Sequence, residues 1–182
     1  MRDAAASGKH QARCSYLIFQ SLQRHGQSTW AKFLKSDGRW RLVGFAGDLR
    51  DATQFRRVHE LGARLAAPDS FLRTYTPSTK SIDSVIELLT VHSGPREAVE
   101  LLDLHEIYHP WDDERGWDYW KVFVDDVSHH EGFDDAYVKY GIGKREGCLV
   151  VCRPDQHLRY VGALEDVEGV EEYFSGILIP QA

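Results

Sequence analysis

The stretch that decides the fold is "GCLVVCRPDQHLRYVG", residues 147–162, in which two β-like runs flank Arg-Pro-Asp-Gln. Proline presets φ for a turn and Asp favours one, so this stretch is predicted to be a β-hairpin. In an extended strand Cys148 and Cys152 point to the same face about 13 Å apart, whereas a disulfide needs Cα atoms within about 7 Å. Both cysteines are therefore predicted to be reduced residues of the core.

The chain before the hairpin alternates between strand-like and helix-like patterns. Residues 38–48 and 84–93 are apolar runs predicted to be strands. Residues 51–66, which begin with the capping residue Asp51, and residues 96–104 are predicted to be helices. The longer helix places four apolar side chains on one face: Phe55, Val58, Leu61 and Leu65. The order at this point is βαβα.

Residues 103–135 break this rhythm, with 11 acidic residues against 2 basic ones, four histidines and three of the five tryptophans. This region is predicted to be a long loop elaboration around one strand at 119–126. A short helix from "DDAYVKYGI", the hairpin and a final helix from "VEGVEEYFSGILI" complete the chain. Residues 21–182 are expected to form a single domain after an irregular N-terminal stub at 1–20.

Charge is divided unevenly within a net charge of −6: residues 1–80 hold 14 Lys/Arg against 6 Asp/Glu, and residues 81–182 hold 8 against 22. The basic residues are scattered through apolar segments, which argues against nucleic-acid binding. The two halves are expected to attract each other, within one fold or across a dimer. No run of about 18 apolar residues and no secretory h-region occurs, so a cytoplasmic protein with reduced thiols and no membrane span is expected.

These segments together resemble a known domain. "AYVKYGI", "CLVVCRPDQHLRYVG" and the closing "YFSGILI", with the earlier "FLKSDGRWRLVGFAGD" and "VFVDD", are similar to the C-terminal domain of the phenol hydroxylase family of flavin-dependent aromatic monooxygenases, over about residues 22–180. The resemblance implies an α/β, thioredoxin-like βαβαββα fold, with a central mixed sheet flanked by helices. It also implies a domain that serves mainly in dimer contacts and carries neither flavin nor catalytic residues.

Two chemistries of related folds lack their motifs here. A dinucleotide site needs a glycine-rich turn between a strand and a helix, and "GIGKREG" (141–147) has the wrong spacing and leads into a strand. Thioredoxin-type redox chemistry needs C-x-x-C after the first strand, where this chain has Ala46-Gly47-Asp48-Leu49. No flavin, other cofactor or thiol-disulfide activity is therefore expected.

A metal site is the first candidate for chemistry within residues 103–135. His105 and His109 are four residues apart, as on one face of a metal-binding helix, and Asp112 and Asp113 could add oxygen ligands. Pro110 opposes this, because the residue before proline is pushed out of the α region. Solvated loop histidines are the favoured interpretation, and no metal is predicted.

An acid/base site is the second candidate. His129 or His130 is the predicted general base, with Asp126 or Glu131 as its orienting partner. The competing interpretation is a polar turn in which Asp134 or Asp135 caps the next helix. Four aromatic residues could form the walls of an aromatic-binding pocket, although at this density a core or an interface is the more usual role: Trp111, Trp117, Trp120 and Phe133.

Two functional hypotheses remain. The favoured one is a non-catalytic association module that forms a homodimer or docks on a separate flavin monooxygenase or other partner. The alternative is a small cofactor-free enzyme of secondary metabolism, an isomerase, cyclase or dehydratase, acting by acid/base chemistry on an aromatic or polyketide-like small molecule. One fold hosts many functions, so the fold does not decide between them.

Overall fold

The computed structural model describes residues 37–95, 99–112, 116–125 and 136–181. Its centre is a mixed sheet with the strand order β5-β2-β1-β6-β7. β1, β2 and β5 are parallel, and β6 and β7 are antiparallel to their neighbours. The strands are β1 (Trp40–Gly47), β2 (Ile86–His92), β5 (Val122–Val124), β6 (Cys148–Cys152) and β7 (Leu158–Gly162).

The predicted hairpin is confirmed as β6 and β7. Val150 lies opposite Val161 in antiparallel register. The turn is closed by the Gln156 N–H, which donates to the Arg153 carbonyl at 2.9 Å, and Gln156 has a φ of 66°. β6 is buried along its whole length and pairs with β1 on its other side, which explains its unbroken apolar sequence.

Helix α3 (Ala52–Ala66) connects the parallel strands β1 and β2, together with the short helix α4 (Phe71–Thr74), which the sequence did not predict. As predicted, Asp51 caps α3: its carboxylate accepts hydrogen bonds from the N–H groups of Thr53 and Gln54. A side-chain cap of this kind is worth about 1 kcal/mol. Three of the four predicted face residues are buried, and Phe55 packs at the edge of the same core.

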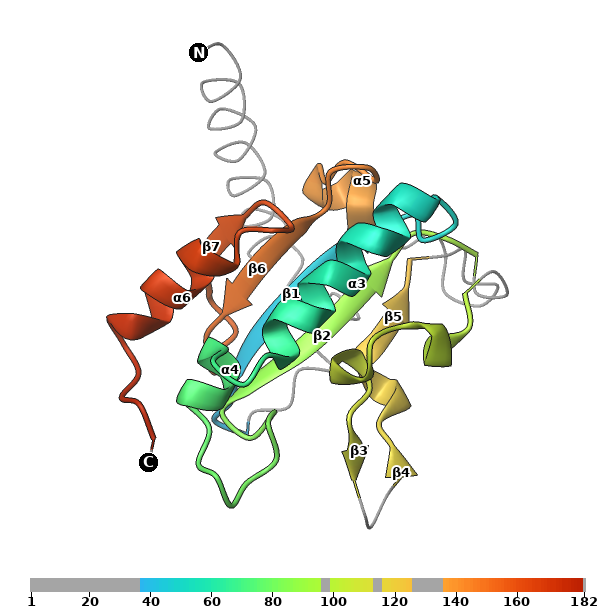
Figure 1. Ribbon diagram of the computed structural model, residues 1–182. Helices are drawn as coiled ribbons and strands as arrows, with labels where there is room; N and C mark the ends of the chain where they lie inside the picture. The colour runs from blue at the N-terminus through green and yellow to red at the C-terminus, as the bar shows by residue number, and fades with distance from the viewer. Residues whose placement is uncertain (1–36, 96–98, 113–115, 126–135, 182) are drawn as a thin grey trace.

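The two faces of the sheet carry separate cores. α3 and α6 (Val167–Ser175) cover one face (Figure 1), where Leu42 and Leu149 are buried. α5 (Ala136–Tyr140) contributes Tyr137 to the other core, which also holds Cys148 and Cys152. Both cysteines are buried, as predicted, and they form no disulfide with each other.

Two predicted helices differ from the structure. In place of a helix at 96–104, the described part of this segment has only a 3₁₀ turn, Leu101–Asp103. The final helix ends at Ser175, not after Ile179, because Gly176 closes it, and the "ILI" run that follows leaves Ile179 78% exposed. The apolar sequence of "ILI" is therefore not helical periodicity.

The region 103–135 is more ordered than a loop in its described parts. It contains a second, two-stranded sheet formed by β3 (Trp111–Asp112) and β4 (Gly116–Trp117), which projects beyond the main sheet in Figure 1. Short 3₁₀ turns at Glu106–Tyr108 and Tyr119–Lys121 flank this hairpin. Among the described residues no helix is long and apolar enough to cross a membrane. The stub predicted at 1–20 lies outside them.

Candidate functional site

Most of the predicted acid/base residues fall outside the described part of the chain: Asp126, His129, His130, Glu131 and Phe133. The described residues on either side of this segment, Asp125 and Ala136, are held together by hydrogen bonds. The Asp125 N–H donates to the His92 carbonyl at 2.8 Å, and the Asp125 carboxylate accepts from the N–H groups of Ala136 and Tyr137 at 2.8 and 3.2 Å. Asp125 thus supports the first turn of α5, a role that the sequence did not reveal. Asp134 and Asp135, the predicted caps, lie outside the described residues.

Tyr137 closes the carboxyl ends of β1 and β2. Its hydroxyl donates to the Val91 carbonyl at 2.8 Å and accepts from the Gly47 N–H at 2.7 Å. Burial raises the pKa of Tyr137 well above its usual range, so the phenol stays protonated. At Gly47 φ is +77°, and a Cβ atom would lie 2.1 Å from the Lys144 carbonyl oxygen, so only glycine fits. In its described part, this edge of the sheet is therefore held together by hydrogen bonds and close packing, which is a structural role.

The buried thiol of Cys152 is unsuited to redox chemistry. Burial raises the pKa of Cys152 to about 12, partly opposed by the nearby positive charge of Arg41. A nucleophilic cysteine needs its thiolate near neutral pH, and this one is protonated there.

The two predicted metal-ligating histidines are engaged by the protein. His105 Nδ1 accepts a hydrogen bond from the Ile107 N–H at 3.2 Å, and His109 Nε2 lies 3.2 Å from the Leu104 carbonyl oxygen. His109 is buried, so the expectation of solvated loop histidines is wrong for this residue, because Trp117 and the 3₁₀ turn enclose it. Its φ of −145° and ψ of 63° lie outside the α region, as Pro110 predicts. No group of three or more metal-ligating side chains occurs among the residues that the structure describes.

The β3–β4 hairpin is built on aromatic rings in edge-to-face contact. Trp111 and Trp117 are opposite each other in the register, with ring centroids 5.2 Å apart and planes at 76°. The His109 ring also contacts Trp117, with ring centroids 5.2 Å apart and planes at 73°. The Asp118 N–H donates to the Pro110 carbonyl at 3.1 Å and closes the base of the hairpin. The hairpin is therefore anchored by Trp117, which is half-buried.

Three large aromatic side chains of this hairpin and the turn after it face solvent. Trp120 is 82% exposed, Trp111 57% and Tyr119 47%. We call these three residues the hairpin aromatic surface. Of the two roles considered for these tryptophans, a core position is excluded for Trp111 and Trp120.

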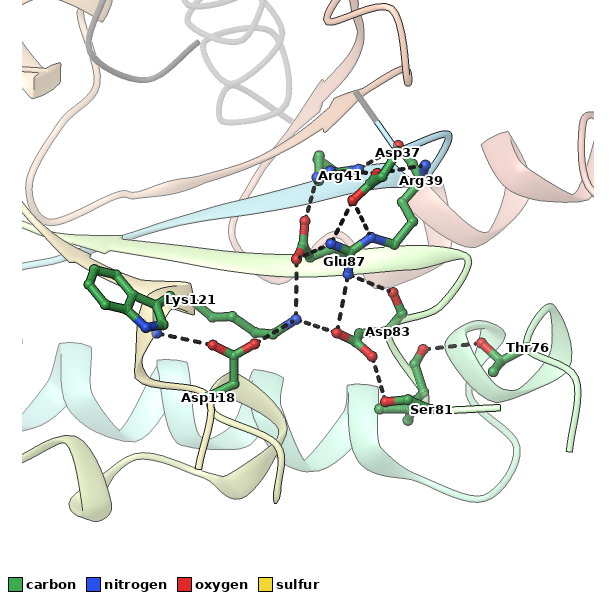
Figure 2. A network of polar contacts seen from close by, with 11 residues as sticks. Asp37, Arg39, Arg41, Thr76, Ser81, Asp83, Glu87, Asp118 and Lys121 are labelled. Atoms are coloured by element: carbon green, nitrogen blue, oxygen red, sulfur yellow. Dashed lines mark hydrogen bonds and ion pairs between the residues drawn. The ribbon is translucent and has the colours of Figure 1, made fainter. Parts of the chain in front are cut away.

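Directly after Trp120, Lys121 is almost completely buried, at 2% exposure. Its ammonium group is ion-paired with Asp83 and lies 3.3 Å from a Glu87 carboxylate oxygen and 3.6 Å from one of Asp118 (Figure 2). Burial alone would raise the pKa of Asp83, but the charge of Lys121 and its hydrogen bonds outweigh burial, and the pKa is lowered. The carboxylate is therefore ionised at neutral pH.

The same carboxylates continue the network to β1. Arg39 is 3.3 Å from Asp83 and 2.9 Å from Glu87, and Arg41 is 2.5 Å from Glu87. Both arginines also pair with Asp37, at 2.7 and 2.8 Å (Figure 2). The pairs of Arg39 and Arg41 with Asp83 and Glu87 join the basic and acidic halves of the sequence within one chain. Arg57–Glu165 and Arg64–Glu168 do the same. The predicted attraction between the halves is thus present inside the fold.

The described part of the molecule is thus a mixed α/β domain with a structural ion network and an exposed aromatic hairpin. The family model described as phenol hydroxylase, C-terminal dimerisation domain, matches residues 25–182, and the chain belongs to this family. The resemblance inferred from the sequence is confirmed.

Curated relatives are monooxygenases by name. The chain is 37% identical over 142 residues to Phenol 2-monooxygenase fsqG of Aspergillus fumigatus, covering 78% of this chain and 22% of the relative. It is 34% identical over 146 residues to FAD-dependent monooxygenase terD of Aspergillus terreus, covering 80% and 24%. It is 35% identical over 147 residues to 3-hydroxybenzoate 4-monooxygenase of Comamonas testosteroni, covering 79% and 22%. The chain therefore spans about a quarter of the length of the curated relatives it matches.

Proposed function

We propose that this chain is an association module that forms a homodimer, or docks on a separate flavin enzyme or other partner, and binds no flavin itself. The observation that carries the proposal is the match of a dimerisation-domain model to residues 25–182. The exposed aromatic residues support it, because tryptophan and tyrosine are enriched in protein interfaces.

The fold proposed for this module is thioredoxin-like. The strand order β2-β1-β6-β7 supports this, with β1 and β2 parallel and joined by α3, and with the β6–β7 hairpin antiparallel beside β1. α6 after the hairpin completes the pattern. β5 is then an addition beside β2. A cytoplasmic location and a setting in secondary metabolism stay predictions from the sequence.

Local geometry supports the proposal that this chain binds no flavin. Residues 141–147 connect α5 to β6, so this glycine-containing segment leads from a helix into a strand. A pyrophosphate-binding turn leads from a strand into a helix, whose N-terminal N–H groups bind the phosphates. Purified protein that carries a flavin absorption band would contradict this part of the proposal.

The test of association is the mass of the purified chain in solution. Light scattering coupled to size exclusion, at micromolar concentration and low salt, is expected to give twice 20.8 kDa. A monomer mass under these conditions, together with no binding to a purified flavin monooxygenase of this family, would refute the proposal.

The alternative is a cofactor-free acid/base enzyme that acts on an aromatic or polyketide-like small molecule. One observation favours it: Asp125 and Ala136, which flank residues 126–135, meet at the carboxyl end of β2 and β5, where α/β sheets commonly bind ligands. The base is His129 or His130, oriented by Asp126 or Glu131. The proposed walls of the pocket are Trp111, Trp117, Trp120 and Phe133.

The alternative is tested with phenolic and polyketide-type compounds, without added flavin or nicotinamide. Separate His129→Ala and His130→Ala variants, with circular dichroism as the folding control, are compared with the parent chain. Loss of a general base lowers the rate by about 10²- to 10⁴-fold. No turnover by the parent chain, or full activity in both variants, would remove these histidines from consideration.

A further inference from the structure

We infer that the hairpin aromatic surface is where two copies of this chain meet, with Trp120 at the centre of the contact. The inference rests on the proposed function and adds to it the location of the interface and its chemistry. It follows from exposure, rigidity and charge at Trp111, Tyr119 and Trp120.

Exposed aromatic groups are concentrated on this hairpin. The hydrogen bond from the Asp118 N–H to the Pro110 carbonyl brings these two residues together. Trp111 directly follows Pro110, and Trp120 is two residues after Asp118. Their Cα atoms are therefore at most about 15 Å apart. Among described residues, the other large exposed apolar side chains are aliphatic and lie elsewhere: Leu102, Val138, and Ile177 and Ile179 in the segment after α6. Clustered tryptophan and tyrosine are typical of the energetic centre of an interface.

Trp120 is held in place from both sides. Its backbone N–H donates to the Asp118 carboxylate at 3.1 Å, and the next residue, Lys121, is fixed by Asp83 and Glu87. The backbone of Trp120 is thus tied to β2, while its side chain stays in solvent. With the backbone fixed, only the two side-chain torsions of Trp120 have to be ordered when a partner covers it.

The charge balance beneath Trp120 suits an identical partner. The network contains three cations, Arg39, Arg41 and Lys121, and four carboxylates, so it is close to neutral. In a two-fold dimer the same surface meets itself and like charges repel, so the aromatic side chains, and not the acidic residues of 111–120, are expected at the centre of the contact. Aromatic rings, in contrast, pair well with each other in edge-to-face or offset geometry, and Trp111 and Trp117 already make an edge-to-face pair within one chain.

The exposed area fits the centre of such a dimer. The three aromatic side chains would cover roughly 400 Å² in each copy, or about 800 Å² in total. Stable interfaces bury about 1,200 to 2,000 Å², so neighbouring residues of the hairpin must supply the rest. An apolar centre with a polar rim is the usual arrangement.

The test measures the dimer dissociation constant of the full 182-residue chain by sedimentation equilibrium. Trp120→Ala is expected to raise the constant about 30-fold or more, as truncation of an interface hot spot does. Ile179→Ala is the matched control, since Ile179 is 78% exposed but lies beyond α6, and it should change the constant less than about threefold. Circular dichroism checks that both variants are folded.

A second variant guards against an indirect effect on the turn. Tyr119→Ala, which leaves Asp118 and Lys121 unchanged, should also weaken the dimer. Raising the salt concentration should not weaken the dimer, because residues 111–120 carry four acidic residues against one basic residue and salt screens the repulsion between the two copies. A dimer whose constant is unchanged in Trp120→Ala and Tyr119→Ala would overturn this inference and leave the proposed function intact. A parent chain that is monomeric throughout would remove both.

Discussion

Replacing Lys121 with Met should destabilise this domain far more than an ordinary surface substitution. The change keeps a side chain of similar length but leaves the carboxylates of Asp83 and Glu87, both mostly buried, with one cation fewer. Removing one partner of a buried ion pair typically costs about 3 to 5 kcal/mol. Arg39 still contacts both carboxylates, so we expect the lower end, about 3 kcal/mol.

The assay is urea unfolding followed by circular dichroism at pH 7. The matched control is Arg56→Ala, which breaks a 3.9 Å pair with Glu60 between two mostly exposed side chains and should cost less than about 0.5 kcal/mol. Each variant is measured at two protein concentrations, because dimerisation adds to apparent stability. A loss below about 1 kcal/mol for Lys121→Met would refute the view that these ion pairs are desolvated and matter to stability.

The pH dependence of the same variant gives an independent check. In the parent chain the pKa of Asp83 is lowered, so its ion pairs stabilise the fold above the unfolded pKa of about 4, and this contribution is lost as pH falls through the folded value. Without Lys121, burial favours the protonated form of Asp83. Lowering the pH then reduces the free-energy cost of burying this carboxyl group. The difference in unfolding free energy between parent and variant should therefore shrink as pH falls from 7 to about 4.

Two further predictions concern other buried groups. Burial, with His59 nearby, lowers the pKa of His105 in the folded chain. The unfolded chain therefore binds more protons below about pH 6.5, and stability should fall as pH drops through this range. Unfolding curves should show a smaller fall for His105→Asn, and an equal fall would contradict the assignment. Cys152, with a pKa of about 12, should react with a thiol reagent at neutral pH only as fast as the domain opens. The reaction is followed by mass spectrometry after trypsin digestion. A rate equal to that of a free thiol would show that the Cys152 thiol is accessible in the folded chain.

Local sequence patterns determined much of this fold. The Arg-Pro-Asp-Gln turn and the flanking β-branched residues specify the β6–β7 hairpin through backbone preferences alone, and Asp51 begins α3 through contacts within three residues. The alternation along β6 placed Cys148 and Cys152 on one buried face, because side-chain direction in a strand depends only on position. Pro110 likewise excluded an α-helical His109.

Tertiary contacts decided what the residues of the 103–135 region do. Nothing near Lys121 in the sequence indicates burial, since a lysine is usually exposed; Asp83 and Glu87, more than thirty positions away, make it possible by supplying compensating charge. The neighbouring Trp120, which hydrophobicity alone would place in the core, is exposed because Lys121 takes the inward position. Burial of a charge and exposure of a tryptophan both depend on which distant groups meet, and that information becomes available only when β2 and the turn after β4 are brought together.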